Sequence, residues 1–117
     1  MPLRKRREAV AGRAYQRFPT AFDAKIEQFG VHLDTQVANI SVRGAKIRMP
    51  EGSRPLYVGM PARLLAEGLD VEGIVIRHVG DSYGLRFGTD IVPLQVIRNN
   101  LPVLRHLCRR TGAFASA

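Results

Sequence analysis

Two runs of alternating apolar and polar residues lie on either side of a Gly-Asp pair. The run DVEGIVIRHV covers residues 70–79 and the run SYGLRF covers residues 82–87, so that only Gly80 and Asp81 separate them. Alternation with a period of two places successive side chains on opposite faces of a strand, and a two-residue link containing glycine is typical of a tight hairpin. This stretch therefore predicts two antiparallel strands.

Similar short runs precede the hairpin, and glycine or proline separates them. They predict strands over residues 22–29, 31–40 and 45–49, with Gly30 ending the first. The turn-rich PEGSRP then leads to a further apolar run at 58–68. A chain of 117 residues fits one domain. Short antiparallel strands joined by turns predict a small β-barrel or a β-sandwich.

The apolar residues near the C-terminus follow a different period, with spacings of three and four. They are Leu94, Ile97, Leu101, Leu104 and Cys108. This spacing predicts a helix with one apolar face. Pro93 suits its first turn, and Thr89 or Asp90 is positioned to cap it. Pro102 interrupts the pattern and predicts a kink or a division into two short helices.

The chain is strongly basic, with a net charge of +8. Basic residues concentrate at the ends: residues 1–17 contain six, with Glu8 as the one acid, and residues 91–117 contain no acid. Such ends attract nucleic acid, acidic membrane surfaces, acidic proteins or small phosphorylated ligands. Most of the basic residues are arginine, which binds phosphate and guanine edges with two parallel hydrogen bonds. A GC-rich genome explains the abundance of arginine equally well.

Several classes of function find no support in the sequence. No apolar run is long enough to span a membrane, and the basic N-terminus lacks the apolar stretch of a secretory signal, so a cytoplasmic protein is expected. The single cysteine cannot form an internal disulfide or a thiolate metal site. Catalytic and phosphate-loop motifs are missing, and the three histidines are scattered. We therefore expect no catalytic residue, no metal and no enzymatic activity.

Two short motifs carry the functional signal. Arg13 and Arg17 lie four residues apart before the first strand, and the stretch NISVRG spans Asn39 to Gly44. In a regular strand Asn39 and Ser41 would share the outer face, and the core face would consist of Ala38, Ile40 and Val42. Gly44 would permit a sharp turn or the close approach of a ligand. A strand that simply ends in a turn accounts for the same residues.

Together, the RxxxR and NxSxxG motifs resemble those of the PilZ domain, the bacterial receptor module for cyclic di-GMP. The segment Gly84 to Phe87 is similar to the G-x-R-F end of the family's late hairpin. The resemblance covers residues 13–110 and implies a single domain, with a basic tail at 1–12 and a second tail at 111–117. It implies a small antiparallel barrel of six strands with a C-terminal helix.

The resemblance also implies a ligand and the residues that bind it. The loop with Arg13 and Arg17 would wrap over cyclic di-GMP, and the complementary surface would be formed by Asn39, Ser41 and Gly44. Arg7 and Arg43 are secondary candidates. Many family members carry aspartate in place of Asn39; a carboxylate accepts from two guanine N–H groups, whereas an amide offers one acceptor, so the affinity is expected to be lower here.

Three classes of function follow. The first is a non-enzymatic receptor in which cyclic di-GMP orders the arginine loop and changes the surface offered to a protein partner in motility, pilus or exopolysaccharide control. The second is an adaptor with the same fold that binds protein but no nucleotide. The third is a small basic barrel that binds RNA or DNA, although eight phenylalanines and tyrosines offer few stacking surfaces. No cofactor besides the ligand is expected.

Overall fold

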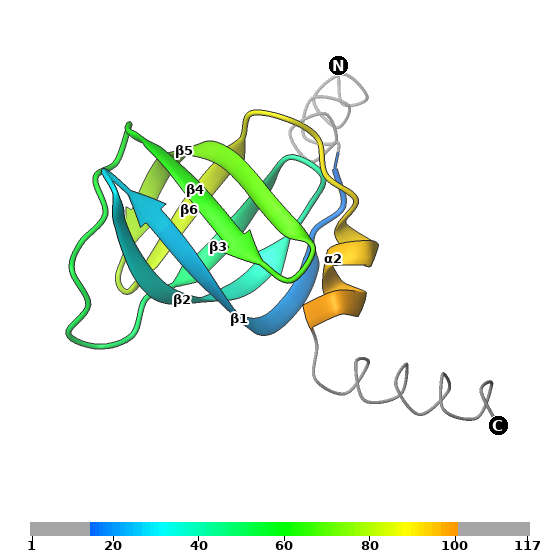
Figure 1. The fold of residues 1–117 in the computed structure, drawn as a ribbon, viewed down its shortest axis with the longest axis horizontal. Coiled ribbons are helices and arrows are strands. Elements are labelled where there is room, and N and C mark those ends of the chain that lie inside the picture. Colours follow the sequence, from blue (N-terminus) through cyan, green and yellow to red (C-terminus); the bar gives the residue numbers. More distant parts are fainter. Residues whose placement is uncertain (1–14, 101–117) are drawn as a thin grey trace, which may run out of the picture.

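Six antiparallel strands form a closed barrel, and one short helix packs beside it (Figure 1). The computed structural model describes residues 15–100. The strands are β1 (Phe18–Gln28), β2 (Val31–Ile40), β3 (Gly44–Arg48), β4 (Pro61–Ala66), β5 (Leu69–Val79) and β6 (Ser82–Phe87), and the helix is α2 (Pro93–Asn100). This architecture confirms the predicted six-stranded barrel with a helix after it. The expected tails, Arg7, Arg13 and the expected kink at Pro102 lie outside the described residues.

The order of strands around the barrel is β1-β2-β3-β6-β5-β4, and β4 pairs with β1 to close it. Alternate residues of each strand point into the barrel, as the period of two requires. The largest fully buried side chains are Phe22, Ile26, Val37, Ile40, Ile47, Leu64 and Val75. They come from five of the strands, so burial of one shared core holds the barrel together.

Most strand boundaries match the expectation, and β1 differs most. It begins at Phe18, not at residue 22, because Phe18 pairs with Ile40 and Pro19 pairs with Asn39. The segment that carries Arg17 therefore enters the barrel directly beside the end of β2. This pairing is the first link between the two sequence motifs.

The predicted core face of β2 is wrong in part. The pairing with β3 passes from Val37 with Ile47 to Asn39 with Lys46, so Ala38 has no partner and forms a β-bulge. Because the bulge resets the alternation, Val37 and Ile40 are fully buried, while Ala38 is only half-buried. Val42, also expected in the core, is half-buried because β2 has ended before it.

The helix starts where expected but presents a different face to the barrel. The Val96 N–H donates to the Val92 carbonyl at 3.2 Å, which leaves Pro93 as the first helical residue. Val96 and Ile97 are buried, whereas Leu94, expected on the apolar face, is 59% exposed. The cap position falls on Val92, so the prediction that Thr89 or Asp90 caps the helix is wrong, and Asp90 pairs with Arg43 instead. Within residues 15–100 no helix has the length and apolarity to cross a membrane.

Candidate functional site

The two sequence motifs meet through one hydrogen bond. Arg17 Nη1 donates to Asn39 Oδ1 at 2.9 Å, across 22 residues of sequence. Arg17 is exposed just before β1, and Asn39 is half-buried near the end of β2. The structure therefore places one arginine of RxxxR beside the first residue of NxSxxG.

Asn39 belongs to a row of residues that crosses four neighbouring strands. It pairs with Lys46 in β3, Lys46 pairs with Gly84 in β6, and Gly84 pairs with Arg77 in β5. All four residues, together with Arg17, line one pocket of about 440 Å³. The barrel register thus assembles a polar and basic surface from residues that are far apart in the sequence.

Gly84 creates the hollow in the middle of this row. A Cβ atom there would lie 3.6 Å from the nearest atoms, which belong to the side chains of Arg77 and Ile76, and that is ordinary contact distance. Its missing side chain therefore leaves open space above the sheet. Sequence reasoning did not assign Gly84, Lys46 or Arg77 to the site, because only the strand register brings them next to Asn39.

The electrostatics of the pocket favour an anionic ligand. Among residues 15–100, no carboxylate forms an ion pair with Arg17, Lys46 or Arg77. Other arginines of the barrel do have such partners: Arg48 pairs with Asp81, and the Arg63–Asp70 pair lies on β4 and β5. Three positive charges thus border the hollow without a neutralising carboxylate from residues 15–100, and such a cluster attracts anionic groups.

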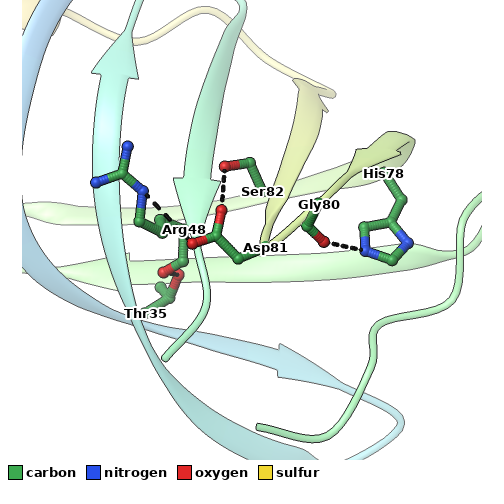
Figure 2. Close-up of polar contacts among 6 residues, drawn as sticks. All are labelled: Thr35, Arg48, His78, Gly80, Asp81 and Ser82. Carbon is green, nitrogen blue, oxygen red and sulfur yellow. Dashed lines mark hydrogen bonds and ion pairs between the residues drawn. The ribbon is translucent and has the colours of Figure 1, made fainter. Parts of the chain in front are cut away.

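The hairpin between β5 and β6 forms one wall of the pocket, through Val79, Ser82 and Tyr83. Figure 2 shows the polar contacts of Asp81, Ser82 and His78 at the turn of this hairpin. Asp81 accepts a hydrogen bond from Ser82 Oγ at 3.1 Å and lies 3.9 Å from Arg48 Nε. The His78 ring lies 2.8 Å from the Gly80 carbonyl and stacks on the Tyr83 ring, with centroids 4.2 Å apart. These contacts hold the turn of the hairpin in place, because the side chains of His78 and Ser82 bond to Gly80 and Asp81.

Ser41 does not lie where the strand pattern predicted. Its side chain is 4% exposed, and both its N–H, at 2.8 Å, and its Oγ, at 3.3 Å, donate to the Gly44 carbonyl. The prediction of an outward hydroxyl beside Asn39 is wrong, because β2 ends at Ile40 and Ser41 belongs to the turn that follows. Ser41 stabilises the turn that joins β2 to β3.

Gly44 has a packing role in that same turn. A Cβ atom on Gly44 would lie 2.6 Å from the Leu85 carbonyl oxygen of β6, which is closer than side chains tolerate. The protein's own backbone therefore occupies the space that glycine leaves. Its expected contact with a ligand stays a prediction.

Arg43, a secondary candidate, is engaged on both sides. Its Nε donates to Asp90 Oδ1 at 2.7 Å, and its guanidinium carbon lies 5.6 Å from the centre of the Tyr15 ring. The hydrogen bond that Arg43 donates to Asp90, and then the negative charge of Asp90, raise the pKa of Arg43. Arg43 thus lies between the arginine segment and the loop before α2. Within residues 15–100 no cluster of three His, Cys, Asp or Glu side chains is arranged to hold a metal.

Comparison with known proteins identifies the fold family. The PilZ domain matches residues 12–101, which include both motifs and the barrel. The structure is similar to that of the Bacillus subtilis inhibitor of motility (MotI/DgrA), with a TM-score of 0.59 and 18% sequence identity over 83% of this chain. The chain covers 50% of the length of that protein. No curated protein matches. The match across most of its length shows that the chain belongs to the PilZ domain family.

Proposed function

We propose that this protein is a non-enzymatic receptor for cyclic di-GMP. One observation carries the proposal: the two motifs meet at a hollow bordered by three cations that have no ion-pair partner among residues 15–100. Membership of the PilZ family supports it, because PilZ domains are generally receptor domains. The ligand carries two phosphates and two guanines, and the site offers groups suited to both.

In this proposal the residues of the row bind different parts of the ligand. Arg17, Lys46 and Arg77 attract the phosphates, and the side-chain oxygen of Asn39 accepts from a guanine N–H. Gly84 leaves room for a planar base or a sugar above the sheet. Because Arg17 already donates to Asn39, the ligand has to compete for that hydrogen bond or use Arg17 after it has turned away. Arg13 would close over the ligand from the same segment as Arg17.

Ser41 and Gly44 act through the turn in this proposal. Ser41 holds the turn by bonding the Gly44 carbonyl, and the turn sets the position of Asn39 at the end of β2. The ordering of the arginine segment then changes the surface offered to a protein partner. The name of the structurally similar inhibitor of motility supports a partner in the motility machinery.

Titration calorimetry with cyclic di-GMP tests the proposal. Arg17→Ala removes a charge-assisted contact, so we expect an affinity at least about thirtyfold lower than that of the parent protein. Arg63→Ala is the matched control, because Arg63 is also an exposed strand-side arginine but pairs with Asp70 away from the pocket. The control should bind as the parent does. If the parent protein and both variants bind cyclic di-GMP with equal affinity, Arg17 is not part of the binding site.

Cyclic di-AMP and single-stranded RNA separate this function from its alternatives. A site with base-specific contacts should prefer the guanine ligand and lose little affinity with added salt, whereas nonspecific nucleic-acid binding weakens steeply. If RNA binds more tightly than cyclic di-GMP at physiological salt, the protein is a nucleic-acid binder. If neither cyclic di-GMP nor RNA binds, the protein is better explained as an adaptor that binds protein but no nucleotide.

A further inference from the structure

We propose that Arg43 couples the arginine segment to the start of α2, so that ligand binding stabilises the loop before the helix. This inference rests on the proposed function, and it assigns to Arg43 a positioning role instead of direct ligand contact. Four contacts within the protein carry it. Two are made by the Arg43 side chain and two by the backbone of the turn between β2 and β3.

The first contact joins Arg43 to the segment that contains the RxxxR motif. Tyr15 lies between the two arginines of that motif, and the Arg43 guanidinium lies over its ring at 5.6 Å. Tyr15 is 42% exposed, and the Arg43 guanidinium connects its ring to the turn between β2 and β3. A cation above an aromatic face is attracted to it, and the attraction grows when the ring is held in place.

The second contact joins Arg43 to the loop that leads into the helix. Arg43 Nε donates to Asp90 Oδ1 at 2.7 Å, and Asp90 lies three residues before Pro93, where α2 begins. Both side chains are more than half exposed, at 55% and 58%. An exposed ion pair is weak and easily populated or lost, so a neighbour that fixes Arg43 changes how often the pair is formed.

The backbone of the same turn connects to the same loop. The Arg43 carbonyl accepts from the Phe87 N–H at 2.7 Å, and the Val42 carbonyl accepts from the Ile91 N–H at 3.0 Å. The Val92 carbonyl in turn accepts the first helical bond, from the Val96 N–H. Hydrogen bonds and the chain between Ile91 and Val92 thus connect the turn, the loop at residues 88–92 and the first turn of α2.

The direction of the effect follows from these contacts. A ligand that holds Arg17 also restrains Tyr15 two residues before it and keeps the Tyr15 ring on the Arg43 guanidinium, and the guanidinium is then held in reach of Asp90. The loop and the first turn of α2 open less often. The amides of Ile91 and Val96 report this opening directly, because each donates one of these hydrogen bonds.

Amide hydrogen exchange of the full chain, with and without cyclic di-GMP, tests the proposal. In the parent protein the ligand should slow exchange at Ile91 and Val96 about threefold or more. Asp90→Asn keeps the size of the side chain but removes its charge. It should bind cyclic di-GMP within about threefold of the parent and lose the slowing at both amides. Equal slowing in the variant, or faster exchange in the parent because the ligand takes Arg43 from Asp90, would overturn the coupling.

A ligand-free double-mutant cycle keeps this test separate from the proposed function. Tyr15→Ala and Asp90→Asn should each speed exchange at Ile91, and together they should speed it less than the product of the single effects. In an Arg43→Ala background neither change should matter. Independent, multiplicative effects would refute the coupling even if cyclic di-GMP binds. Coupled effects without binding in calorimetry would support it and refute only the choice of ligand.

Discussion

Gly44 and Gly84 lie on the adjacent strands β3 and β6, and the missing side chain serves a different purpose in each region. At Gly44 the carbonyl of Leu85 occupies the space where a Cβ atom would stand, 2.6 Å away. At Gly84 a Cβ atom would meet side chains at 3.6 Å, and the space beyond is a pocket. One glycine is therefore required by the fold, while the other borders an open pocket. Both belong to motifs, so motif membership alone does not separate the two roles.

The largest effect should follow from filling the space at Gly44. Gly44→Ala pushes a methyl group against the β6 backbone, which cannot move alone because it is paired on both sides. We expect the free energy of unfolding to fall by about 3 kcal/mol, measured by urea denaturation. Gly84→Ala is the matched control and should change it by less than about 0.5 kcal/mol. If the free energy of unfolding falls by a similar amount in both variants, the two glycines do not have the different roles inferred from their surroundings.

The second effect concerns binding instead of stability. Gly84→Leu fills the hollow between Lys46 and Arg77, so the affinity for cyclic di-GMP should fall at least about tenfold, which corresponds to about 1.4 kcal/mol. Thermal denaturation of the same variant controls for folding, because its midpoint should stay close to that of the parent. A stable variant that binds normally would show that the ligand lies elsewhere.

Gly30 extends the comparison, because glycine is required there for its backbone conformation alone and not for lack of space. Gly30 follows β1 with a φ of 78°, and no atom lies within 4 Å of the position a Cβ would take. Gly30→Ala should therefore lower the free energy of unfolding by about 1 kcal/mol through backbone strain alone. The loss should fall between those of Gly84→Ala and Gly44→Ala in the same urea measurement. A loss as large as that of Gly44→Ala would contradict the view that steric contact dominates there.

The smallest effect distinguishes the cations of β3. Lys46→Gln removes a charge at the hollow, and the affinity for cyclic di-GMP should fall about threefold to fivefold. The difference should shrink as salt is added, because the group is exposed. Arg48→Gln is the control: Arg48 lies two residues further along the same strand and pairs with Asp81, so its loss should leave the affinity nearly unchanged. The opposite ranking in calorimetry would place the ligand over the hairpin end of the strand.

The fold was predictable because its signals are local. The hairpin at Gly80 and Asp81, the glycine and proline between strands, and the period of two each depend on neighbouring residues, and the structure confirms a six-stranded barrel. The family was recognised from two short motifs, and the match over residues 12–101 confirms it. Of the expected site residues, Arg17 and Asn39 do lie together.

The errors arise where one residue shifts the alternation. The bulge at Ala38 cannot be recognised in the sequence, because any residue of the run QVANI could be the one without a partner in the neighbouring strand. The bulge accounts for the misplaced Ala38, whereas Ser41 and Val42 were misplaced because β2 ends at Ile40, before both of them. Lys46, Gly84 and Arg77 were missed because they become neighbours only through strand register, which depends on the whole barrel and not on any short stretch.

The closing junction of the barrel has a mechanical consequence. β1 and β4 are joined by three residue pairs, whereas β4 and β5 are joined by six. The helix α2 packs against β1, and Asn100 hydrogen-bonds both the N–H and the carbonyl of Glu67 in the turn after β4. It therefore bridges the short junction, as its place beside the barrel in Figure 1 illustrates. Under a force that pulls β1 away from β4, the barrel would open between these two strands. The force needed would depend on how firmly α2, a helix of eight residues, stays attached to both sides.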